Sequence, residues 1–330
     1  MGEFDLIERY FKAPARALQS NDGVLLGIGD DCALLQPAAV MQLAISSDML
    51  VEGRHFFADV DPFTLGHKAL AVNLSDLAAC GAKPLAFTLA LALPKADEAW
   101  LAPFSRGLLA LAAEHNCTLI GGDTTQGPLN ICITVFGEVP KNGALLRSGA
   151  QVGDDIYVSG TLGDARLALE VMRGNLTLPV EEFASAKSRL ETPTPRVDLG
   201  VALRGIATSA IDVSDGLLGD LGHILKQSQV GAVINTSIAI NLIASKAINT
   251  PATSQFNHEM QLKYVLSGGD DYELAFTAPV HLRDAVQAAA LTSKTPVTRI
   301  GQIEAELGLR LVDALGHSVS NNFGSFDHFQ

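Results

Sequence analysis

Aspartates stand repeatedly at the end of apolar runs in this sequence, or inside them. The first pair, Asp30 and Asp31, lies between the apolar segments 24–26 and 33–35. Taken alone, this pair favours a solvated turn over a cation site, because Gly-Asp is common turn chemistry. The same setting recurs further along the chain, at Asp48, Asp76, Asp123, Asp212, Asp215, Asp270 and Asp271. The recurrence shifts the interpretation towards a shared cation site.

Ionised carboxylates in apolar surroundings need positive charge nearby. Two of them about 4 Å apart repel by roughly 4 kcal/mol at an effective dielectric constant of about 20. The first half offers few basic residues close to them in sequence: Arg54, Lys68 and Arg147. A divalent metal is therefore the expected compensation. Because the candidate ligands are all oxygens, including the hydroxyls of Ser46 and Ser47 beside Asp48, magnesium fits better than zinc.

Each aspartate also has a simpler explanation. Asp164 and Asp215 could each cap the helix that follows, and any of the others could form a turn. The complete set nevertheless favours a metal cluster. Since magnesium in proteins is commonly completed by substrate phosphates, the set indicates phosphoryl transfer.

Common phosphate-binding motifs are absent from the sequence. It contains neither the P-loop pattern Gly-x-x-x-x-Gly-Lys-Ser/Thr nor Gly-x-Gly-x-x-Gly. The glycine pairs 121–122 and 268–269 could allow the backbone to approach a ligand closely. Arg147 could hold a phosphate or be a solvated loop residue, and its spacing does not separate the two.

Composition restricts the class of protein. The chain has 330 residues, 48% hydrophobic and 18% charged, which indicates a globular protein of two domains. Its net charge of −13 argues against nucleic acid as a partner. The four cysteines form no Cys-x-x-Cys pair, so we expect free thiols in a reducing cytoplasm. No signal peptide is visible, and the longest apolar run, 85–93, is shorter than the ~20 residues of a membrane helix.

The pattern of apolar residues predicts mixed helices and strands. We expect an amphipathic helix within residues 1–20, and further helices at 64–80, 97–115, 164–174, 195–205, 215–229 and 280–291. Strands are expected at 24–27, 42–47, 85–93, 117–121, 129–138, 155–159, 209–213, 231–236 and 272–278. The polar segment 237–257 is predicted to be a long loop. The glycine-rich segment 141–155 is the expected boundary between domains 1–150 and 151–330.

The motifs that contain these aspartates resemble those of a known family. They are Gly-Ile-Gly-Asp-Asp-Cys-Ala, Ser-Ser-Asp, Asn-Leu-Ser-Asp-Leu-Ala-Ala, Gly-Gly-Asp-Thr-Thr, Asp-Val-Ser-Asp-Gly-Leu and Ser-Gly-Gly-Asp-Asp-Tyr-Glu-Leu. Six motifs in this order resemble the bacterial thiamine-monophosphate kinase family, of the aminoimidazole-ribonucleotide-synthetase-like superfamily of ATP-using enzymes. The resemblance runs from about residue 3 to Phe326-Asp327-His328-Phe329.

The resemblance implies a fold and an activity. The fold is α+β with mixed sheets, in two domains, and the N-terminal sheets of a homodimer join into a barrel to which strands 85–93 and 129–137 would contribute. Domain 1–150 would bind ATP and magnesium and form the dimer, and domain 151–330 would complete the nucleotide and substrate site. The implied reaction transfers the γ-phosphoryl group of ATP directly to thiamine monophosphate. The products are thiamine diphosphate and ADP, in the last step of thiamine diphosphate biosynthesis.

Site residues follow from matching motifs. The implied ligands of several Mg²⁺ ions are Asp30, Ser46, Ser47, Asp48, Asp76, Asp123, Asp212 and Asp215. The implied ATP contacts are Gly122, Asp123, Arg147 and Ser214, and the implied contacts to the thiamine substrate are His55, Asp270 and Phe323. Without the resemblance, His55 is a solvated loop histidine. The sequence departs from the family where Asp270 replaces a common glutamate and where Phe323 replaces a tryptophan or tyrosine.

Other readings fit less well. A selenophosphate synthetase would need a reactive cysteine or selenocysteine in an N-terminal glycine-rich segment, and the hydrogenase-maturation relative ends in a functional cysteine. The motifs of aminoimidazole ribonucleotide synthetase match less closely. A non-catalytic magnesium–nucleotide module would be expected to lose ligands, and this chain retains the set. The Gly-Asp-Asp of nucleic-acid polymerases conflicts with the acidic charge balance.

Overall fold

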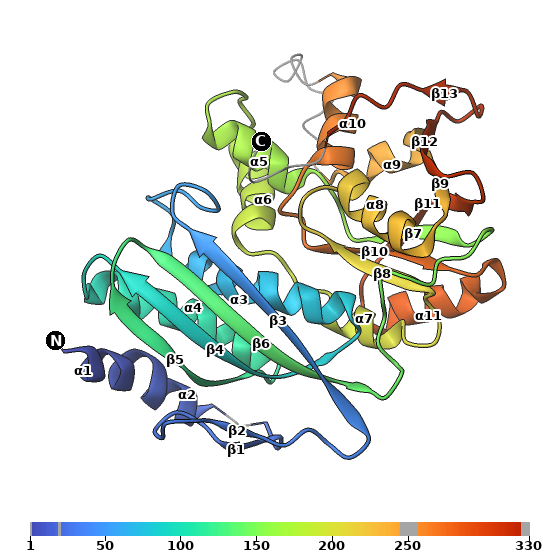
Figure 1. Ribbon diagram of the computed structural model, residues 1–330. Helices are drawn as coiled ribbons and strands as arrows, with labels where there is room; N and C mark the ends of the chain where they lie inside the picture. The colour runs from blue at the N-terminus through green and yellow to red at the C-terminus, as the bar shows by residue number, and fades with distance from the viewer. Residues whose placement is uncertain (1, 19–20, 245–256, 325–330) are drawn as a thin grey trace. The chain divides into compact units, whose positions relative to one another are not determined.

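The computed structural model describes residues 2–18, 21–244 and 257–324, without the side chains of Glu3 and Phe4. Part of the loop expected at 237–257 and the C-terminal motif Phe326–Phe329 lie outside the described residues. The chain divides into two compact units (Figure 1), Met1–Leu77 with Ala82–Ala144 and Ala78–Gly81 with Leu145–Gln330.

The first unit is built on a four-stranded sheet with the order β3-β6-β4-β5. Its strands are β3 (Met41–Val51), β6 (Asn130–Pro140), β4 (Lys83–Leu93) and β5 (Thr118–Gln126). All neighbours are antiparallel except β4 and β5, which are parallel and connected through a helix. The strands expected here are confirmed, although each is longer than its apolar core. A hairpin of β1 (Val24–Leu26) and β2 (Leu34–Leu35) precedes the sheet.

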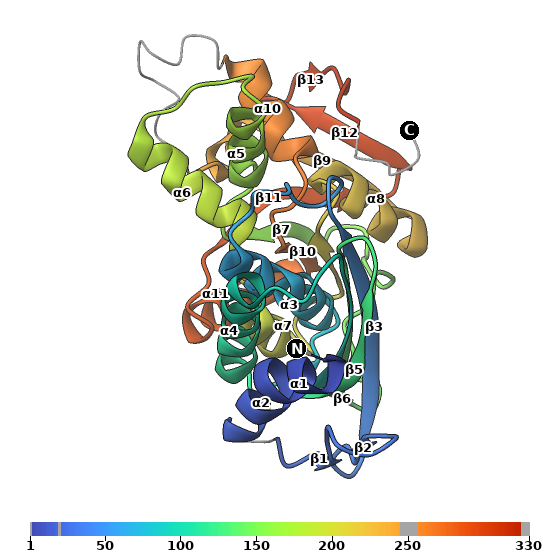
Figure 2. The same cartoon turned by 90° about the vertical axis from the view of Figure 1, so that its left-hand side faces the viewer.

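Two helices lie on one face of this sheet, α3 (Pro62–Ala79) and α4 (Glu98–Glu114) (Figures 1 and 2). Aspartates begin both helices: the Phe63 N–H donates to Asp61 Oδ1, and the Ala99 N–H donates to Asp97 Oδ1. Glycines let the two helices touch. A Cβ at Gly66 would lie 2.1 Å from Phe104 O, so only glycine fits. Both helices confirm the expected ones.

The N-terminal helix is divided into three segments, α1 (Glu3–Ile7), the π-helical η1 (Glu8–Lys12) and α2 (Ala13–Ala17). Pro14 has no N–H to continue the i→i−4 ladder. Ala13 donates instead to Glu8 O, the i→i−5 pattern of a π-turn. The helix expected within residues 1–20 is therefore present, but it is interrupted by a π-helical segment.

The second unit has a seven-stranded sheet with the order β13-β12-β9-β11-β7-β10-β8. Its strands are β7 (Asp155–Ser159), β8 (Ser209–Val213), β9 (Gly231–Asn235), β10 (Glu273–Ala278), β11 (Val297–Glu304), β12 (Gly308–Val312) and β13 (Ser318–Val319). Every residue of β7, β8 and β10 is buried, which explains why apolar residues follow one another in the middle of these strands instead of alternating with polar ones. β7 to β10 confirm the expected strands, whereas β11, β12 and β13 were not expected.

Helices cover both faces of this second sheet. They are α5 (Asp164–Met172), α6 (Val180–Glu191), α7 (Val197–Ala202), α8 (Leu217–Ser228), α9 (Thr236–Ala239), α10 (His258–Ser267) and α11 (Arg283–Thr292), with 3₁₀ turns η2 (Ile240–Leu242) and η5 (Val280–Leu282). Within the unit, α5, α8 and α10 lie on one face of the sheet and α7 and α11 on the other (Figure 1).

The expectation of a loop over 237–257 was wrong at its start. The Asn235 side chain accepts hydrogen bonds from the Ser237 and Ile238 N–H groups and so begins α9. The helices α6 and α10 were also not expected. Across the described residues, no helix has the length and apolar character needed to cross a membrane.

Candidate active site

Strand β3 and helix α3 bring three of the expected metal ligands together in the first unit. The Ser46 hydroxyl donates a hydrogen bond to Asp76 Oδ2, and the Asp48 N–H donates to Asn73 Oδ1 over 3.1 Å. Residues 46 and 48 share a face of β3 because side chains alternate along a strand. Asn73 and Asp76 share a face of α3 because they are three residues apart. The Ser46 hydroxyl and the Asp76 carboxylate are therefore in direct contact, and Asp48 lies on the same face of β3.

Ser47 and Asp123 lie on the opposite face of the same sheet. The Ser47 hydroxyl donates to Ile133 O over 3.2 Å and lies 3.0 Å from Thr134 Oγ1. Asp123 is paired with Ala90, in a row that continues to Met49 on β3. Because paired residues share a face of the sheet, this row places Asp123 with Ser47 rather than with Asp48.

Asp30 occupies the exposed turn between β1 and β2. The Asp31 N–H donates to Asp30 Oδ1 over 3.2 Å, a local turn interaction. Gly29 beside it has φ = +136°, and a Cβ there would lie 3.4 Å from Arg16 Nη2 and 3.6 Å from Lys12 Cε. Two basic residues of the N-terminal helices, Lys12 and Arg16, therefore lie near this acidic turn. They were not predicted as its neighbours because they are distant from it in sequence.

Gly122 and His55 have clear local structural roles. Gly122 has φ = +145°, and a Cβ there would lie 1.8 Å from Leu89 O, so the close approach of β5 to β4 requires glycine. His55 Nδ1 accepts a hydrogen bond from the Val51 N–H over 3.0 Å. This bond fixes the neutral ring with its proton on Nε2. His55 is thus ordered in the turn after β3, unlike a solvated loop histidine.

In the second unit, the end of β8 carries Asp212, and a short loop of Ser214, Asp215 and Gly216 leads into α8. Asp212 is 6% exposed and lies opposite Leu274 of β10. The N–H groups of Ser214 and Asp215 donate to Asp220 Oδ2 over 3.0 and 3.1 Å. Asp220 was not among the expected site residues.

The Asp220 side chain is 4% exposed. Burial raises the pKa of the Asp220 carboxyl to about 7, against the lowering effect of the N–H bonds from the loop, while the Asp215 carboxylate also raises it. The sequence did offer a signal for Asp220. It lies four residues after Gly216, and an aspartate at that distance can bond to the backbone N–H groups near the start of the helix.

The loop before β10 carries Asp270 and is bonded to the β8 loop. Asp270 N–H donates to Ser214 O and Tyr272 N–H donates to Val213 O, both over 2.8 Å. Asp270 and Tyr272 have φ of +66° and +51°, a conformation that side chains rarely adopt. The Tyr272 hydroxyl lies 3.4 Å from Asp270 Oδ1. An expected ATP contact, Ser214, and an expected substrate contact, Asp270, are thus adjacent.

Two buried acidic residues, Asp271 and Glu273, hold this loop in place. Asp271 is fully buried, its Oδ2 accepts from the Gly163 N–H over 2.8 Å, and burial raises its pKa well above the ordinary range. Glu273 is also fully buried. It accepts hydrogen bonds from Arg189 Nη2 at 2.6 Å, Arg196 Nε at 2.7 Å and Ser159 Oγ at 2.6 Å. Asp271 belongs to the recurring aspartates of the sequence, whereas Glu273 and its arginine partners were not expected, because those partners are distant in sequence.

The remaining expected residues, Arg147 and Phe323, lie in different settings of the second unit. Arg147 is exposed, and its carbonyl accepts from the Ser228 hydroxyl over 3.3 Å. Ser228 Oγ in turn accepts from the Gly149 N–H over 3.1 Å, which fixes the segment at the end of α8. Phe323 is partly buried and packs against the apolar core of the unit.

The donor chemistry of the Ser46, Asp48 and Asp76 group is that of a hard cation site. Two carboxylates and a hydroxyl supply only oxygen, the ligand that magnesium prefers, and magnesium retains waters for its other positions. Within the described part of the chain, no group of three or more His, Cys, Asp or Glu residues is gathered closely enough to hold a metal ion. The group of two carboxylates and a hydroxyl fits magnesium that is completed by water and phosphate.

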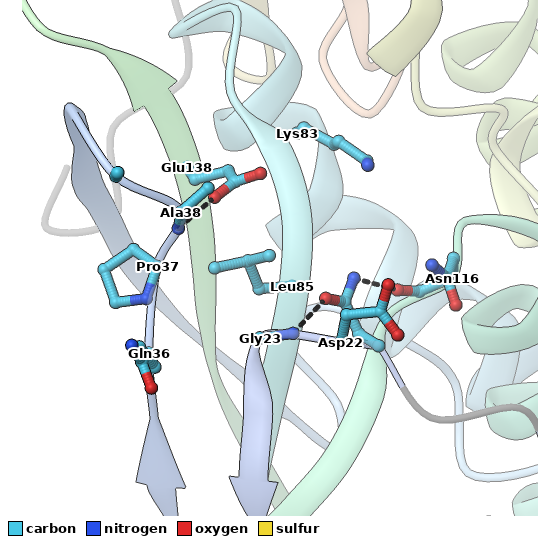
Figure 3. A pocket seen from close by; sticks show the side chains of 11 residues that line it. Asp22, Gly23, Gln36, Pro37, Ala38, Lys83, Leu85, Asn116 and Glu138 are labelled. Atoms are coloured by element: carbon cyan, nitrogen blue, oxygen red, sulfur yellow. Dashed lines mark hydrogen bonds between the residues drawn. The ribbon is translucent and has the colours of Figure 1, made fainter.

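A separate cavity of about 540 Å³ opens in the first unit. Its lining comprises Asn21, Asp22, Gly23, Gln36, Pro37, Ala38, Ala39, Lys83, Leu85, Asn116 and Glu138. Figure 3 shows the Ala38 N–H donating to Glu138 Oε2, a distance of 3.1 Å. None of the expected site residues is among these lining residues.

Comparison with known proteins assigns both units to one family. The AIR synthase related protein, N-terminal domain, matches residues 29–139, and the corresponding C-terminal domain matches residues 151–314. The thiamine-monophosphate kinase of Escherichia coli strain K12 is 47% identical over 331 residues, covering 99% of this chain and 98% of the relative.

Two solved structures support the same family assignment. The thiamine-monophosphate kinase of Stenotrophomonas maltophilia K279a has a TM-score of 0.84 at 45% identity, covering 97% of this chain and 98% of that one. The structure described as AaThiL complexed with AMPPCP and TMP has a TM-score of 0.76 at 27% identity, covering 99% and 97%. The resemblance inferred from the six motifs and the two-domain α/β architecture are confirmed. This chain belongs to the thiamine-monophosphate kinase family of the AIR synthase related proteins.

Proposed function

We propose that this chain transfers the γ-phosphoryl group of ATP to thiamine monophosphate. A phosphate oxygen of thiamine monophosphate attacks the γ-phosphorus, and the bond to the β,γ-bridging oxygen breaks. That oxygen leaves with the electron pair as part of ADP, and the new bond completes thiamine diphosphate. The observation that carries the proposal is the 47% identity to a thiamine-monophosphate kinase over nearly the whole chain. A relative bound to AMPPCP, an ATP analogue, and to TMP gives further support.

Magnesium is the proposed metal cofactor, with several ions involved. The proposed ligands are Asp30, Ser46, Ser47, Asp48, Asp76, Asp123, Asp212 and Asp215. Ser46, Asp48 and Asp76 have the strongest support, and Ser47 and Asp123, on the opposite face of the sheet, have the weakest. When bound, the ions would neutralise the repulsion between two sets of phosphates. No protein nucleophile is needed, because binding and orientation of two phosphates supply much of the rate in phosphoryl transfer.

The remaining residues are proposed to orient the substrates. Gly122, Asp123, Arg147 and Ser214 are the proposed ATP contacts, and His55, Asp270 and Phe323 the proposed contacts to thiamine monophosphate. The His55 ring carries its proton on Nε2, the state in which it donates to a phosphate oxygen. Domain 1–150 would supply the metal and dimer surfaces, and domain 151–330 the rest of the nucleotide and substrate site.

A homodimer is proposed to form through the open face of the first sheet. On the edge strand β3, Leu43, Ile45 and Met49 are 42%, 60% and 53% exposed. These side chains share one face because they alternate along the strand. A second copy would bury them and extend the sheet into a barrel. Strands β4 and β6, named above for this role, are interior strands, so the edge strand β3 is the better candidate.

A coupled assay for ADP release tests the proposed function. With ATP and magnesium, turnover is expected with thiamine monophosphate and not with formylglycinamidine ribonucleotide, the substrate of aminoimidazole ribonucleotide synthetase. The product should be confirmed as thiamine diphosphate by mass spectrometry. Turnover of the ribonucleotide alone would reject the assignment. A cytoplasmic setting is also proposed, and the four cysteines are free, as expected in a reducing compartment.

A further inference from the structure

We propose that Asp220 is a positioning residue for the transfer reaction, holding the Ser214–Gly216 loop and, through it, the backbone at Asp270. This inference rests on the proposed function, which uses Ser214, Asp215 and Asp270 as contacts to nucleotide, metal and substrate. Asp220 itself touches none of the reacting groups in this scheme. Its effect would be exerted through the conformation of the two loops.

The first step of the argument is the way α8 begins. Its N-cap residue is Gly216, with φ = +112°, which has no side chain to accept hydrogen bonds from the first turn. A Cβ at Gly216 would lie 2.9 Å from Ser267 C, so a capping side chain would not fit there. Asp220, within the first turns of the helix, instead holds the chain that leads into it, since its Oδ2 accepts hydrogen bonds from the N–H groups of Ser214 and Asp215.

The second step is the connection from this loop to the loop before β10. The Ser214 carbonyl accepts from the Asp270 N–H over 2.8 Å. A Cβ at Gly269 would lie 2.5 Å from Ser214 O, so the two loops are in close backbone contact. The left-handed conformation of Asp270 is unfavourable for a residue with a side chain and persists only where the surroundings hold it. A loop released at Ser214 would therefore also release Asp270.

The third step is that the acceptor position matters more than the charge. Both N–H groups bond to the same oxygen, Oδ2. An asparagine can place its amide oxygen at that position and keep both bonds. An alanine leaves two N–H groups without this acceptor in a site where Asp220 is only 4% exposed. A glutamate keeps an acceptor but displaces it by one methylene.

The test compares Asp220→Ala, Asp220→Asn and Asp220→Glu with the wild-type chain. Steady-state kinetics give kcat and KM for ATP and for thiamine monophosphate at saturating magnesium. Hydrogen exchange of the 212–217 segment reports the loop without any turnover. Loss of an outer supporting side chain at a metal site commonly costs about 10–100-fold. We expect a loss of that size in kcat/KM for both substrates with Asp220→Ala, together with faster exchange of the Ser214 and Asp215 amides.

Asp220→Asn should remain within about threefold of wild type, and Asp220→Glu should lie between the two, because the acceptor geometry decides the effect. The matched control is Asp155→Asn. Asp155 is also a buried aspartate of the second unit, 2% exposed, but it pairs with Ala278 at the other end of β10. Its loss should lower Tm and leave the KM values and loop exchange unchanged.

Several results would overturn the inference. The inference would be rejected if Asp220→Ala had wild-type kinetics. It would also be rejected if Asp220→Asn and Asp220→Ala lost kcat/KM equally, because the hydrogen-bond acceptor would then not decide the effect. Should Asp220→Ala not fold, wild-type kinetics in Asp220→Glu would have the same consequence. If the wild-type chain does not phosphorylate thiamine monophosphate, the proposed function fails. The positioning role of Asp220 is then tested by hydrogen exchange alone. Unchanged protection of the Ser214 and Asp215 amides in Asp220→Ala would reject it.

Discussion

The hydrogen bond between Ser46 and Asp76 sets the state of the proposed metal ligands before any ion binds. A serine hydroxyl donates one proton and keeps two lone pairs, so Ser46 Oγ can bond to Asp76 and still ligate a cation. The bond also fixes the Asp76 rotamer, which lowers the entropy that ordering this side chain would otherwise cost on binding. At the scale of single residues, the proposed site is therefore partly pre-organised by contacts between its candidate ligands.

The first prediction concerns Asp76. Asp76→Asn should reduce kcat/KM more than about 100-fold, because loss of a ligand exceeds the 10–100-fold cost of losing an outer supporting residue. Folding should be little affected, since Asp76 is only half-buried and the amide is similar in size. Activity by ADP release and Tm by calorimetry measure the two effects. The control is Asp59→Asn, an exposed loop aspartate. Equal activity in the two variants would contradict the ligand role.

The second prediction is the pH dependence of stability at Asp155. Burial acts to raise the pKa of this carboxyl, but hydrogen bonds and charge from Arg283 and Arg299 outweigh it and lower the pKa below its ordinary value. A lowered folded-state pKa means that the stabilisation is present above the ordinary aspartate value of about 3.9 and is lost as pH falls through the folded value. Asp155→Asn should lower the free energy of unfolding by about 1.5–3 kcal/mol at neutral pH.

Denaturant titrations of wild type and Asp155→Asn at several pH values measure this difference. The gap between them should be constant from about pH 5 to 7 and close below about pH 4. Each arginine is nearly half-exposed, so the gap should also shrink in high salt. If the difference in unfolding free energy instead grew at acidic pH, the Asp155 pKa would not be lowered in the folded state.

At the scale of elements, apolar patterning predicted most of what positions the site. Strand β4 is a nearly continuous apolar run, α3 is apolar on nearly every side and α4 is amphipathic, so their existence followed from the sequence. Helix α6 was missed because only Ala186, Leu190 and Glu191 are buried on it, too few for a clear apolar face. Strands β11 and β12 were missed because their exposed and half-buried residues obscure the period of two.

Long-range polar contacts could not be predicted in the same way. Glu273 binds Arg189 and Arg196, which lie 84 and 77 residues away in sequence. The face of β5 that carries Asp123 depends on a bulge between β4 and β5 that shifts the register. The candidate site residues were chosen from the sequence, whereas the faces on which they lie and the contacts that hold them depend on tertiary packing.

The third prediction concerns the contact between α3 and α4. A Cβ at Gly107 would lie 1.9 Å from Phe63 O, and one at Gly66 would lie 2.1 Å from Phe104 O. Gly66→Ala and Gly107→Ala should each destabilise by about 1–3 kcal/mol, because the helices must separate. The control is Gly222→Ala in α8, where a Cβ would meet nothing within 4 Å and helix propensity favours alanine. Thermal unfolding distinguishes them, and equal Tm shifts would contradict the close-packing argument.

At the scale of the whole molecule, the first unit leaves apolar surface on the edge strand β3, and the proposed dimer would cover it. Surface of this kind is typical of association sites rather than of isolated sheets. The second unit has its exposed apolar residues on separate helices and loops, among them Val180 and Leu291. Association is therefore expected through the first unit.

The fourth prediction tests that association. Ile45→Asp places a charge on the face of β3 that a second copy would bury, so the molecular mass in solution should fall from dimer to monomer. Sedimentation velocity over a range of concentrations measures the mass. Leu291→Asp, a residue 79% exposed in the second unit, serves as control and should remain dimeric. A wild-type chain that sediments as a monomer would reject the proposed dimer.

The strand order of the second sheet also bears on how the chain matures during translation. β7, β8 and β9 have no partners among themselves, because β10 lies between β7 and β8 and β11 lies between β7 and β9. The first three strands to leave the ribosome in this half must wait unpaired until residues 273–304 have been made. The four-stranded sheet, complete by residue 140, has no such delay. Nascent chains halted before β10 should thus be the ones that chaperones bind.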